Sequence, residues 1–315
     1  MKTPLILWVT EQGRAVAQKL KGVAGGEVKR YQTREVEKAF AERRPLIFVG
    51  ACGIAVRAIA PNLRHKSLDP AVVVIDEEAR FVISLLSGHL GGANALARKL
   101  AKALKATPVI TTASDLRGLP ALDLWLQENG AVFDDFQRLK ELQVKLLREG
   151  RVKIFVEPPL KLPLPHGLEE VSTGEEADLI LTYRRREKTF PVRALCLGVG
   201  FHAEEKGLFA KVEDILIRNG LSPQAIWRVA TINRAGRRPL LEELASALGA
   251  EALLIEERDL KRTSPPSASR ALEFLGLPGV AEPAALLAAE GGPLILPKQV
   301  YEGISLAATI HRRYT

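Results

Sequence analysis

The sequence lacks the long hydrophobic runs of a membrane protein. Its longest apolar runs fall well short of the roughly 20 residues that a membrane-spanning helix needs, so we expect no membrane partner. Residues 1–9 contain one lysine and a short apolar run, without the small-residue cleavage site of a signal peptide. This pattern favours a buried first strand and a cytoplasmic location.

Paired cysteines and phosphate-binding motifs are also missing. The two cysteines, Cys52 and Cys196, lie far apart in apolar stretches, and neither has a CxxC partner. We therefore expect two small buried side chains rather than a disulfide or a set of metal ligands. Neither GxxxxGK(S/T) nor GxGxxG occurs, which counts against a nucleotide-binding regulator.

Aromatic residues make up only 5% of the chain, although its net charge is +8 and its pI is about 9.5. A basic protein binds either a nucleic acid or a smaller polyanion. Here the basic residues are scattered, and the densest cluster, residues 184–188, is short and resembles a solvated linker. We expect no nucleic-acid partner and favour a polyanionic small molecule.

What the chain does contain is an alternation of strand and helix patterns, typical of an α/β fold with a mostly parallel sheet. Strands are predicted over residues 5–9, 46–49, 71–75, 81–86 and 108–112, with helical segments between several of them. A second alternation starts at residue 192. We predict an N-terminal parallel-sheet α/β domain (residues 1–120), a small variable middle domain or connector (121–190) and a C-terminal α/β domain (191–315).

The most informative stretch is residues 85–101, LLSGHLGGANALARKLA, where a strand turns through glycines into a helix. Such a junction points bare N–H groups and the positive end of a helix dipole into one crevice, which suits an anion. His89 is a candidate general acid or base, and Ser87 can cap the helix or donate to a substrate oxygen. The other candidate binding residues are Gly88, Gly91, Gly92 and Asn94. An ordinary helix cap with a surface histidine is the alternative.

Two further strand ends carry candidate residues. Gly50, Gly53 and Arg57 follow one strand, where glycines allow close approach of a substrate carboxylate or simply form a tight turn. Thr111, Thr112 and Asp115 follow another, and Asp115 either steadies a cationic His89 or caps a helix. We expect these junctions and the Ser87 turn to share one sheet edge and form one wall of a cleft.

The last domain repeats the strand–glycine theme at Gly198, Gly200 and His202, and Lys298 precedes a predicted C-terminal hairpin. His202 is a candidate acid or base or an exposed loop histidine. Lys298 either binds an anionic substrate or is a solvated edge charge.

Ordered segments of the chain resemble the CbiG family of anaerobic cobalamin biosynthesis. They are residues 50–61 (GACGIAVRAIAP), 69–76 (DPAVVVID), 85–94 (LLSGHLGGAN) and 107–115 (TPVITTASD). Residues 284–289 and 296–303 (LPKQVYEG) resemble that family's C-terminal domain, which CobE-type proteins share. One loop departs from the family pattern: residues 198–207 lack its basic pair, which weakens the assignment of an anion contact to that loop.

The resemblance implies a cobalt-precorrin-5A hydrolase, which opens the ring-A δ-lactone and releases acetaldehyde to give cobalt-precorrin-5B. Hydrolysis needs a base to activate water and a donor for the oxyanion, so we hypothesise that His89 activates water and that Ser87 or the Gly88 N–H stabilises the oxyanion. We expect no cofactor, because the cobalt travels with the corrinoid substrate, and neighbouring pathway enzymes as partners. A non-catalytic carrier of the same corrinoid intermediate is the alternative.

Overall fold

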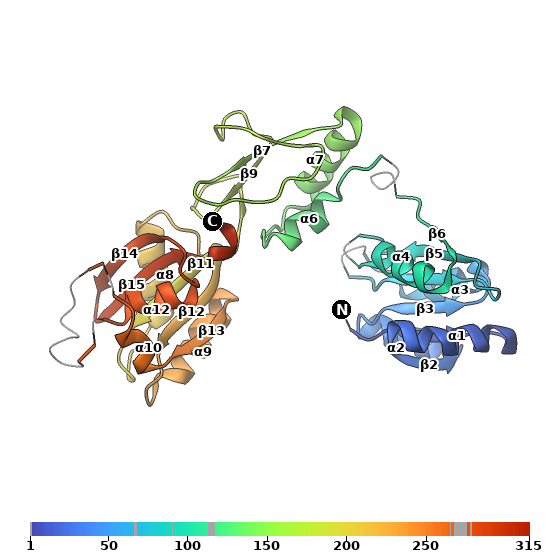
Figure 1. Ribbon diagram of the computed structural model, residues 1–315, viewed down its shortest axis with the longest axis horizontal. Coiled ribbons are helices and arrows are strands. Elements are labelled where there is room, and N and C mark those ends of the chain that lie inside the picture. Colours follow the sequence, from blue (N-terminus) through green and yellow to red (C-terminus); the bar gives the residue numbers. More distant parts are fainter. Residues whose placement is uncertain are drawn as a thin grey trace. The chain divides into compact units, whose positions relative to one another are not determined.

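The computed structural model describes residues 2–65, 68–89, 91–112, 117–264, 266–267, 276–277 and 279–315. The chain forms two compact units, Met1–Leu124 and Trp125–Thr315, and each is described by itself (Figure 1). The expected middle segment and C-terminal domain both fall in the second unit. Within the described ranges, no helix has the length and apolar character to cross a membrane.

The first unit is built on a six-stranded sheet with the order β2-β1-β3-β4-β5-β6. Its elements are β1 (Leu5–Trp8), α1 (Glu11–Ala24), β2 (Glu27–Arg30), α2 (Thr33–Ala41), β3 (Leu46–Val49), α3 (Cys52–Ile59), the short 3-10 helix η1 (Ala60–Asn62), β4 (Val72–Ile75), β5 (Phe81–Leu86), α4 (Ala93–Leu104) and β6 (Thr107–Val109).

Alternate side chains of these strands enter two separate cores, because successive residues of a strand point to opposite faces. Ile6 and Ile47 pack against α1 and α4, whereas Leu7 and Phe48 pack against α2 and α3. The apolar runs of β3 and β4 are buried throughout, as expected of strands covered on both sides. The unit is therefore a three-layer α/β structure, which confirms the predicted fold class.

The last two strands run against the others. β1 to β4 are mutually parallel, but β5 is antiparallel to β4, and β6 is parallel to β5. The physical reason is the short connection at residues 76–80, since a parallel crossover needs a dozen or more residues. The carboxyl ends of β5 and β6 consequently lie at the sheet edge where β3 and β4 begin.

The second unit contains two sheets. A four-stranded parallel sheet has the order β10-β9-β7-β8, and a five-stranded sheet has the order β13-β12-β11-β15-β14. The elements are α6 (Leu122–Glu128, which begins in the first unit), α7 (Phe136–Glu149), β7 (Val152–Val156), β8 (Leu168–Glu170), β9 (Leu179–Thr182), β10 (Phe190–Pro191), β11 (Leu195–Gly200), α8 (Leu208–Arg218), η2 (Pro223–Ala225), β12 (Ile226–Ile232), α9 (Arg237–Leu248), β13 (Glu251–Ile255), α10 (Glu257–Lys261), α12 (Ala281–Ala288), β14 (Leu294–Tyr301), β15 (Ile304–Ile310) and η3 (Arg312–Tyr314).

The five-stranded sheet positions the four candidate residues of the second unit, Gly198, Gly200, His202 and Lys298. β11, β12 and β13 are parallel, and β15 returns antiparallel beside β11, with Gly200 paired to Ser305. The tip of the β14–β15 hairpin therefore lies at the same edge as the carboxyl ends of the three parallel strands. Right-handed crossovers place α8 and α9 on one face and α12 on the other, where α12 packs on Cys196, Ala230 and Ile232.

Candidate functional site

The predicted residues of the first unit lie at two opposite edges of its sheet, so the expected single wall is wrong. Gly50 follows the carboxyl end of β3, and its N–H donates to the Ile75 carbonyl at the end of β4. Leu86, at the end of β5, pairs instead with Val72 at the start of β4. A four-residue strand of roughly 13 Å separates the two edges. The Ser87 turn and Thr111–Thr112 do share an edge, as expected.

The backbone of the Ser87 turn closes the start of α4. The carbonyls of Ser87 and Gly88 accept hydrogen bonds from the N–H groups of Ala93 (3.1 Å) and Asn94 (2.9 Å). The expectation of bare N–H groups at this helix end is therefore wrong for these two. Ser87 adopts a positive φ of 56°, and its hydroxyl donates to the Asp69 carbonyl at 2.9 Å, so it does not cap the helix.

The glycines and the asparagine of this turn have packing roles. A Cβ at Gly91 would lie 2.4 Å from Ser87 Cβ, and one at Gly88 would lie 2.7 Å from Asn94 Oδ1. Gly92 has a φ of 85° and precedes α4. Asn94 is buried, accepts a hydrogen bond from Ser84 (2.6 Å) and donates to Thr112 Oγ1 (2.9 Å). These contacts hold the backbone that presents the half-buried His89 side chain.

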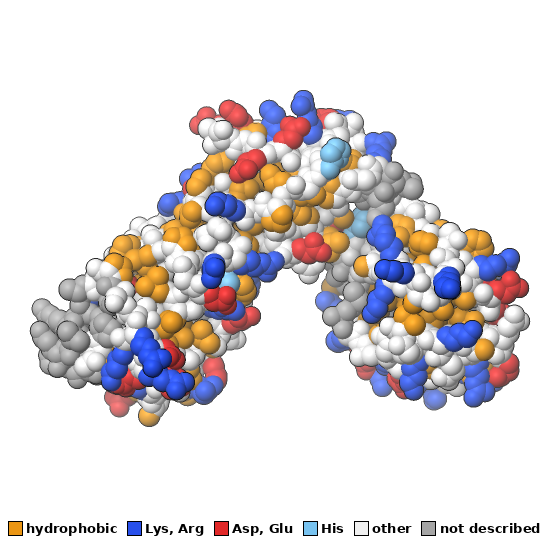
Figure 2. Space-filling model, in the orientation of Figure 1, with side chains coloured by type: hydrophobic (Ala, Val, Ile, Leu, Met, Phe, Trp, Pro, Cys, Tyr) orange, Lys and Arg blue, Asp and Glu red, His pale blue; other side chains and the backbone are white. Residues whose placement is uncertain are grey.

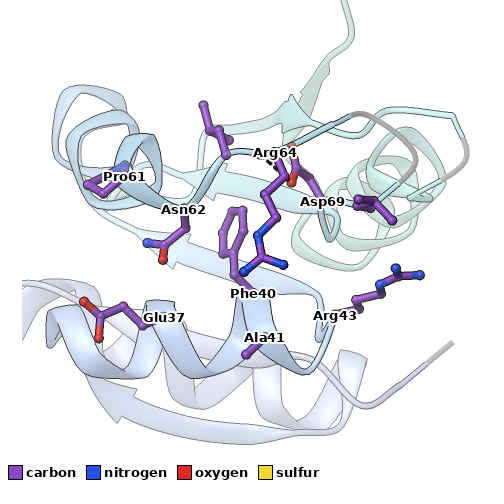
Figure 3. A pocket seen from close by; sticks show the side chains of 10 residues that line it. Glu37, Phe40, Ala41, Arg43, Pro61, Asn62, Arg64 and Asp69 are labelled. Atoms are coloured by element: carbon purple, nitrogen blue, oxygen red, sulfur yellow. Dashed lines mark hydrogen bonds between the residues drawn. The ribbon is translucent and has the colours of Figure 1, made fainter.

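Asp69, which accepts a hydrogen bond from the Ser87 hydroxyl, lines a cavity of about 300 Å³. Figure 3 shows this cavity and the side chains around it. Asp69 joins the turn to the cavity, because its carbonyl accepts from Ser87 while its carboxylate accepts from the Arg64 N–H at 3.0 Å. Glu37 on α2 and Arg43, which follows the end of that helix, lie at opposite ends of the cavity, with Arg64 between them. The Ser87 turn therefore lies next to a cavity that is large enough for part of a ligand.

The lining of the cavity is mostly polar, and some of its polar groups have no partner among the described residues. The Asn62 side-chain nitrogen is buried and has no hydrogen-bond partner in the part of the chain that the structure describes. Over the same residues, no carboxylate lies within 4.0 Å of the guanidinium of Arg43 or Arg64. A buried donor without an acceptor is costly, so Asn62 leaves an unsatisfied polar group behind this wall. Arg43 and Arg64, which line the cavity, are the groups that an anionic ligand would contact.

The other edge holds the remaining predicted residues of this unit. Gly50 has a φ of 150°, where a Cβ would approach Val9 Cγ2 to 3.1 Å. Gly53 lies in the first turn of α3, and the exposed Arg57 side chain reaches back toward it. Asp115, a predicted catalytic residue, lies outside the described residues. Thr111 is exposed, and Thr112 is half-buried.

In the second unit, Gly198 does not contribute to a ligand site. A Cβ there would lie 1.9 Å from the Ala281 carbonyl oxygen and 2.4 Å from Ala285 N. The glycine is buried and lets α12 pack directly on β11. The prediction that Gly198 binds substrate is therefore wrong, since helix–sheet packing occupies this position.

Gly200, His202 and Lys298, predicted from segments far apart in the chain, do meet. They line a cavity of about 250 Å³ at the carboxyl edge of β11, together with Phe201 and Val280. A Cβ at Gly200 would lie 2.5 Å from Ser305 Oγ, so the glycine keeps that hydroxyl open to the cavity. His202 is exposed and Lys298 half-buried.

Among the residues of this cavity that the sequence analysis did not name, two have polar side chains, Arg237 and Ser305. Arg237 begins α9, and its guanidinium carbon lies 5.6 Å from the centre of the Phe201 ring. Burial and then the charge of Arg234 lower the pKa of Arg237 from its ordinary value. A second alternation of strands and helices was predicted from residue 192, but no local signal could show that the Arg237 side chain reaches the Phe201 ring.

The buried carboxylate of Glu282 fixes one wall of this cavity. It accepts hydrogen bonds from the Lys298 N–H (2.9 Å), the Ser267 N–H (3.0 Å) and the Ser267 hydroxyl (2.7 Å). Burial raises its pKa, but these bonds and the Lys298 charge outweigh burial, so the pKa is lowered. Among the described residues, no group of three His, Cys, Asp or Glu side chains could hold a metal ion.

Comparison with known proteins identifies the family of this chain. Two family models match: Cobalamin synthesis G N-terminal over residues 34–115, and Cobalamin synthesis G C-terminus over residues 195–309. Cobalt-precorrin-5A hydrolase of Priestia megaterium is 29% identical over 297 residues, which cover 86% of this chain and 79% of that protein. A protein of the same name from Salmonella typhimurium is 51% identical over 119 residues, 38% of this chain and 34% of that one.

A solved structure of a cobalamin biosynthesis protein G homologue from Sulfolobus solfataricus aligns with 98% of this chain and 97% of its own, at 22% identity and a TM-score of 0.42. The two family models occur in the family's order and together span more than half of the residues. The chain belongs to the CbiG family of cobalamin biosynthesis proteins.

Proposed function

We propose that this protein is a cobalt-precorrin-5A hydrolase that opens the ring-A δ-lactone and cleaves a carbon–carbon bond to release acetaldehyde. The similarity to a hydrolase of that name along 86% of the chain supports the reaction class. The observation that carries the site is the hydrogen-bonded Ser87-Gly88-His89 turn, which Asp69 joins to a polar cavity lined by Arg43 and Arg64. A corrinoid intermediate carries peripheral carboxylates, which such a cavity suits.

The reaction requires the removal of a proton twice, first from water and then from a hydroxyl group, and one histidine can act as the base each time. Water adds to the lactone carbonyl and loses a proton to a base, and the C–O bond then opens to a carboxylate and a hydroxyl group. Loss of the hydroxyl proton and cleavage of the adjacent C–C bond release acetaldehyde, while the ring carbon takes up a proton. His89 is the proposed base in both steps, because imidazole exchanges protons near neutral pH.

One hydrogen bond favours the Gly88 N–H over the Ser87 hydroxyl as the oxyanion donor. The Ser87 hydroxyl already donates to the Asp69 carbonyl, so we assign it the role of holding the turn. The backbone N–H of Gly88 is then the proposed donor, on a backbone that the Ala93 and Asn94 hydrogen bonds keep in place. We propose no resident cofactor, because cobalt enters as part of the substrate. The proposed location of the reaction is the cytoplasm.

Side-chain charges on the visible surface agree with a small-molecule partner. On the face drawn in Figure 2, acidic side chains lie beside basic ones in the second unit, and toward the margins of the first unit. The net charge of +8 therefore does not gather there into one continuous basic stripe of the kind that binds nucleic acid.

The test is an anaerobic assay of acetaldehyde release from cobalt-precorrin-5A by the wild-type protein and by His89→Asn. Loss of a general base should reduce kcat by about 10²–10⁴-fold. His166→Asn is the matched control, because His166 is exposed and lies in the other unit. Corrinoid binding without acetaldehyde release by the wild type would instead support the non-catalytic carrier, and normal turnover by His89→Asn would remove His89 from the mechanism.

A further inference from the structure

The cavity at the carboxyl edge of β11 contains an arginine that pairs with no described carboxylate. Arg234 pairs with Glu257 at 2.8 Å, and Arg238 pairs with Glu242 at 3.3 Å. Between them in sequence, Arg237 has no carboxylate within 4.0 Å among the residues that the structure describes. It is half-buried and lies over the face of the buried Phe201 ring.

The start of α9 makes this arrangement electrostatically unfavourable for the protein alone. Its first turn contains Arg237 and Arg238 and no acidic residue, and Gly236 provides no side-chain cap. Cations are disfavoured at a helix N-terminus, where the dipole is positive. Local conflicts of this kind are expected at functional sites, and a bound anion would resolve this one.

The remaining walls define the chemistry of the ligand. Phe201, Val280, Val300 and Ile304 are apolar, and Val300 is 72% exposed at the rim. Lys298 adds a second cation, held in place through its backbone by Glu282. A volume of about 250 Å³ suits a short carbon arm with a terminal anion rather than a whole macrocycle.

We propose that this cavity is a subsite for one peripheral carboxylate arm of a corrinoid, with Arg237 as its principal ligand. Arginine binds a carboxylate through two parallel N–H bonds, and the apolar wall receives the methylene groups of the arm. From the start of α9, Arg237 reaches the Phe201 ring directly after β11 and so places its charge in the cavity. The proposal rests on the proposed function for the identity of the ligand.

The binding test compares a cobalt corrinoid with free peripheral carboxylates with one whose arms are amides. Arg237→Gln should weaken binding of the carboxylate corrinoid by about 10–100-fold, in line with loss of a hydrogen-bonded charge pair, and leave the amide corrinoid unchanged. Arg238→Gln is the matched control, because it removes the neighbouring charge from a pair at the surface, where the Arg238 side chain is 67% exposed. Arg237→Lys should retain part of the affinity.

Equal affinities of Arg237→Gln and Arg238→Gln for the carboxylate corrinoid would refute the subsite. A measurement on the wild type gives a second test that needs no variant: added salt should weaken binding of the carboxylate corrinoid more than that of the amide corrinoid. Identical salt dependence of the two ligands would also overturn the proposal.

Turnover separates this proposal from the proposed function. Arg237→Gln should raise KM for cobalt-precorrin-5A and leave kcat unchanged, whereas His89→Asn lowers kcat. If acetaldehyde forms and KM is unchanged in Arg237→Gln, the subsite fails and the hydrolase stands. If neither the wild type nor any variant forms acetaldehyde, but Arg237→Gln alone loses affinity for the carboxylate corrinoid, the hydrolase fails and the subsite stands.

Discussion

Glu282→Gln should destabilise the second unit by about 2 kcal/mol at pH 7. Glu282 is only 2% exposed, and its two carboxylate oxygens accept three hydrogen bonds from Ser267 and Lys298. Glutamine keeps one oxygen, which can accept two of them, but its NH₂ group then faces the third donor. Loss of one hydrogen bond to a charged group costs about 1.5–3 kcal/mol, which gives the expected magnitude.

The pH dependence of this difference gives a sharper test. The folded-state pKa of Glu282 is lowered from its ordinary value, so its stabilising contribution is fully present above that ordinary value, about 4.3. The contribution is lost as the pH falls through the lower folded-state pKa. The difference in unfolding free energy between wild type and Glu282→Gln should therefore stay constant from pH 7 to about 5, and shrink below pH 4.

Denaturant unfolding, followed by circular dichroism at several pH values, measures this difference. Ser267→Ala provides a second comparison, since it removes only the hydroxyl bond of 2.7 Å and should cost less than Glu282→Gln. Equal stability of Glu282→Gln and wild type at pH 7 would refute the reasoning. So would a difference that grows as the pH falls.

Three further predictions concern packing and titration. Gly198→Ala should destabilise the second unit by about 3 kcal/mol through overpacking, whereas Gly22→Ala, with open space around it in α1, should stabilise the first by about 0.5–1 kcal/mol; equal thermal shifts would contradict this. Burial raises the pKa of Cys196 to about 12, so a thiol reagent should modify only the half-buried Cys52 in the native protein, and rapid reaction of both would be inconsistent. Burial lowers the pKa of His311, so its contribution to stability should decline as the pH falls below about 6.5, and His311→Asn should flatten that part of a stability profile.

The alternation of apolar strands and amphipathic helices was sufficient to predict the α/β class. The runs 46–49 and 71–75 contain the buried strands β3 and β4, because continuous β-branched and aliphatic residues suit a strand covered on both faces. The glycine-to-helix junction at residues 87–93 was also predicted correctly, since Gly92 has a positive φ of 85° directly before α4.

The direction of β5 is encoded locally in the sequence. Only five residues, 76–80, separate β4 from β5, which is too short for a parallel crossover. This spacing places the Ser87 turn at the edge opposite Gly50, contrary to the predicted single wall. The error over Gly198 has a different origin, because a glycine that admits a helix backbone and one that admits a ligand look the same in a sequence.

By itself, the sequence determined the α/β class, the family resemblance and the candidate residues at the ends of individual strands, because these depend on local periodicity and motif. Only the tertiary structure decided which of those residues meet. Strand order and direction separated Gly50 from Ser87, and the pairing of β11 with β15 joined Gly200 to Ser305. Arg237 entered the same cavity through helix packing, a contact between residues far apart in the chain that no local pattern encodes.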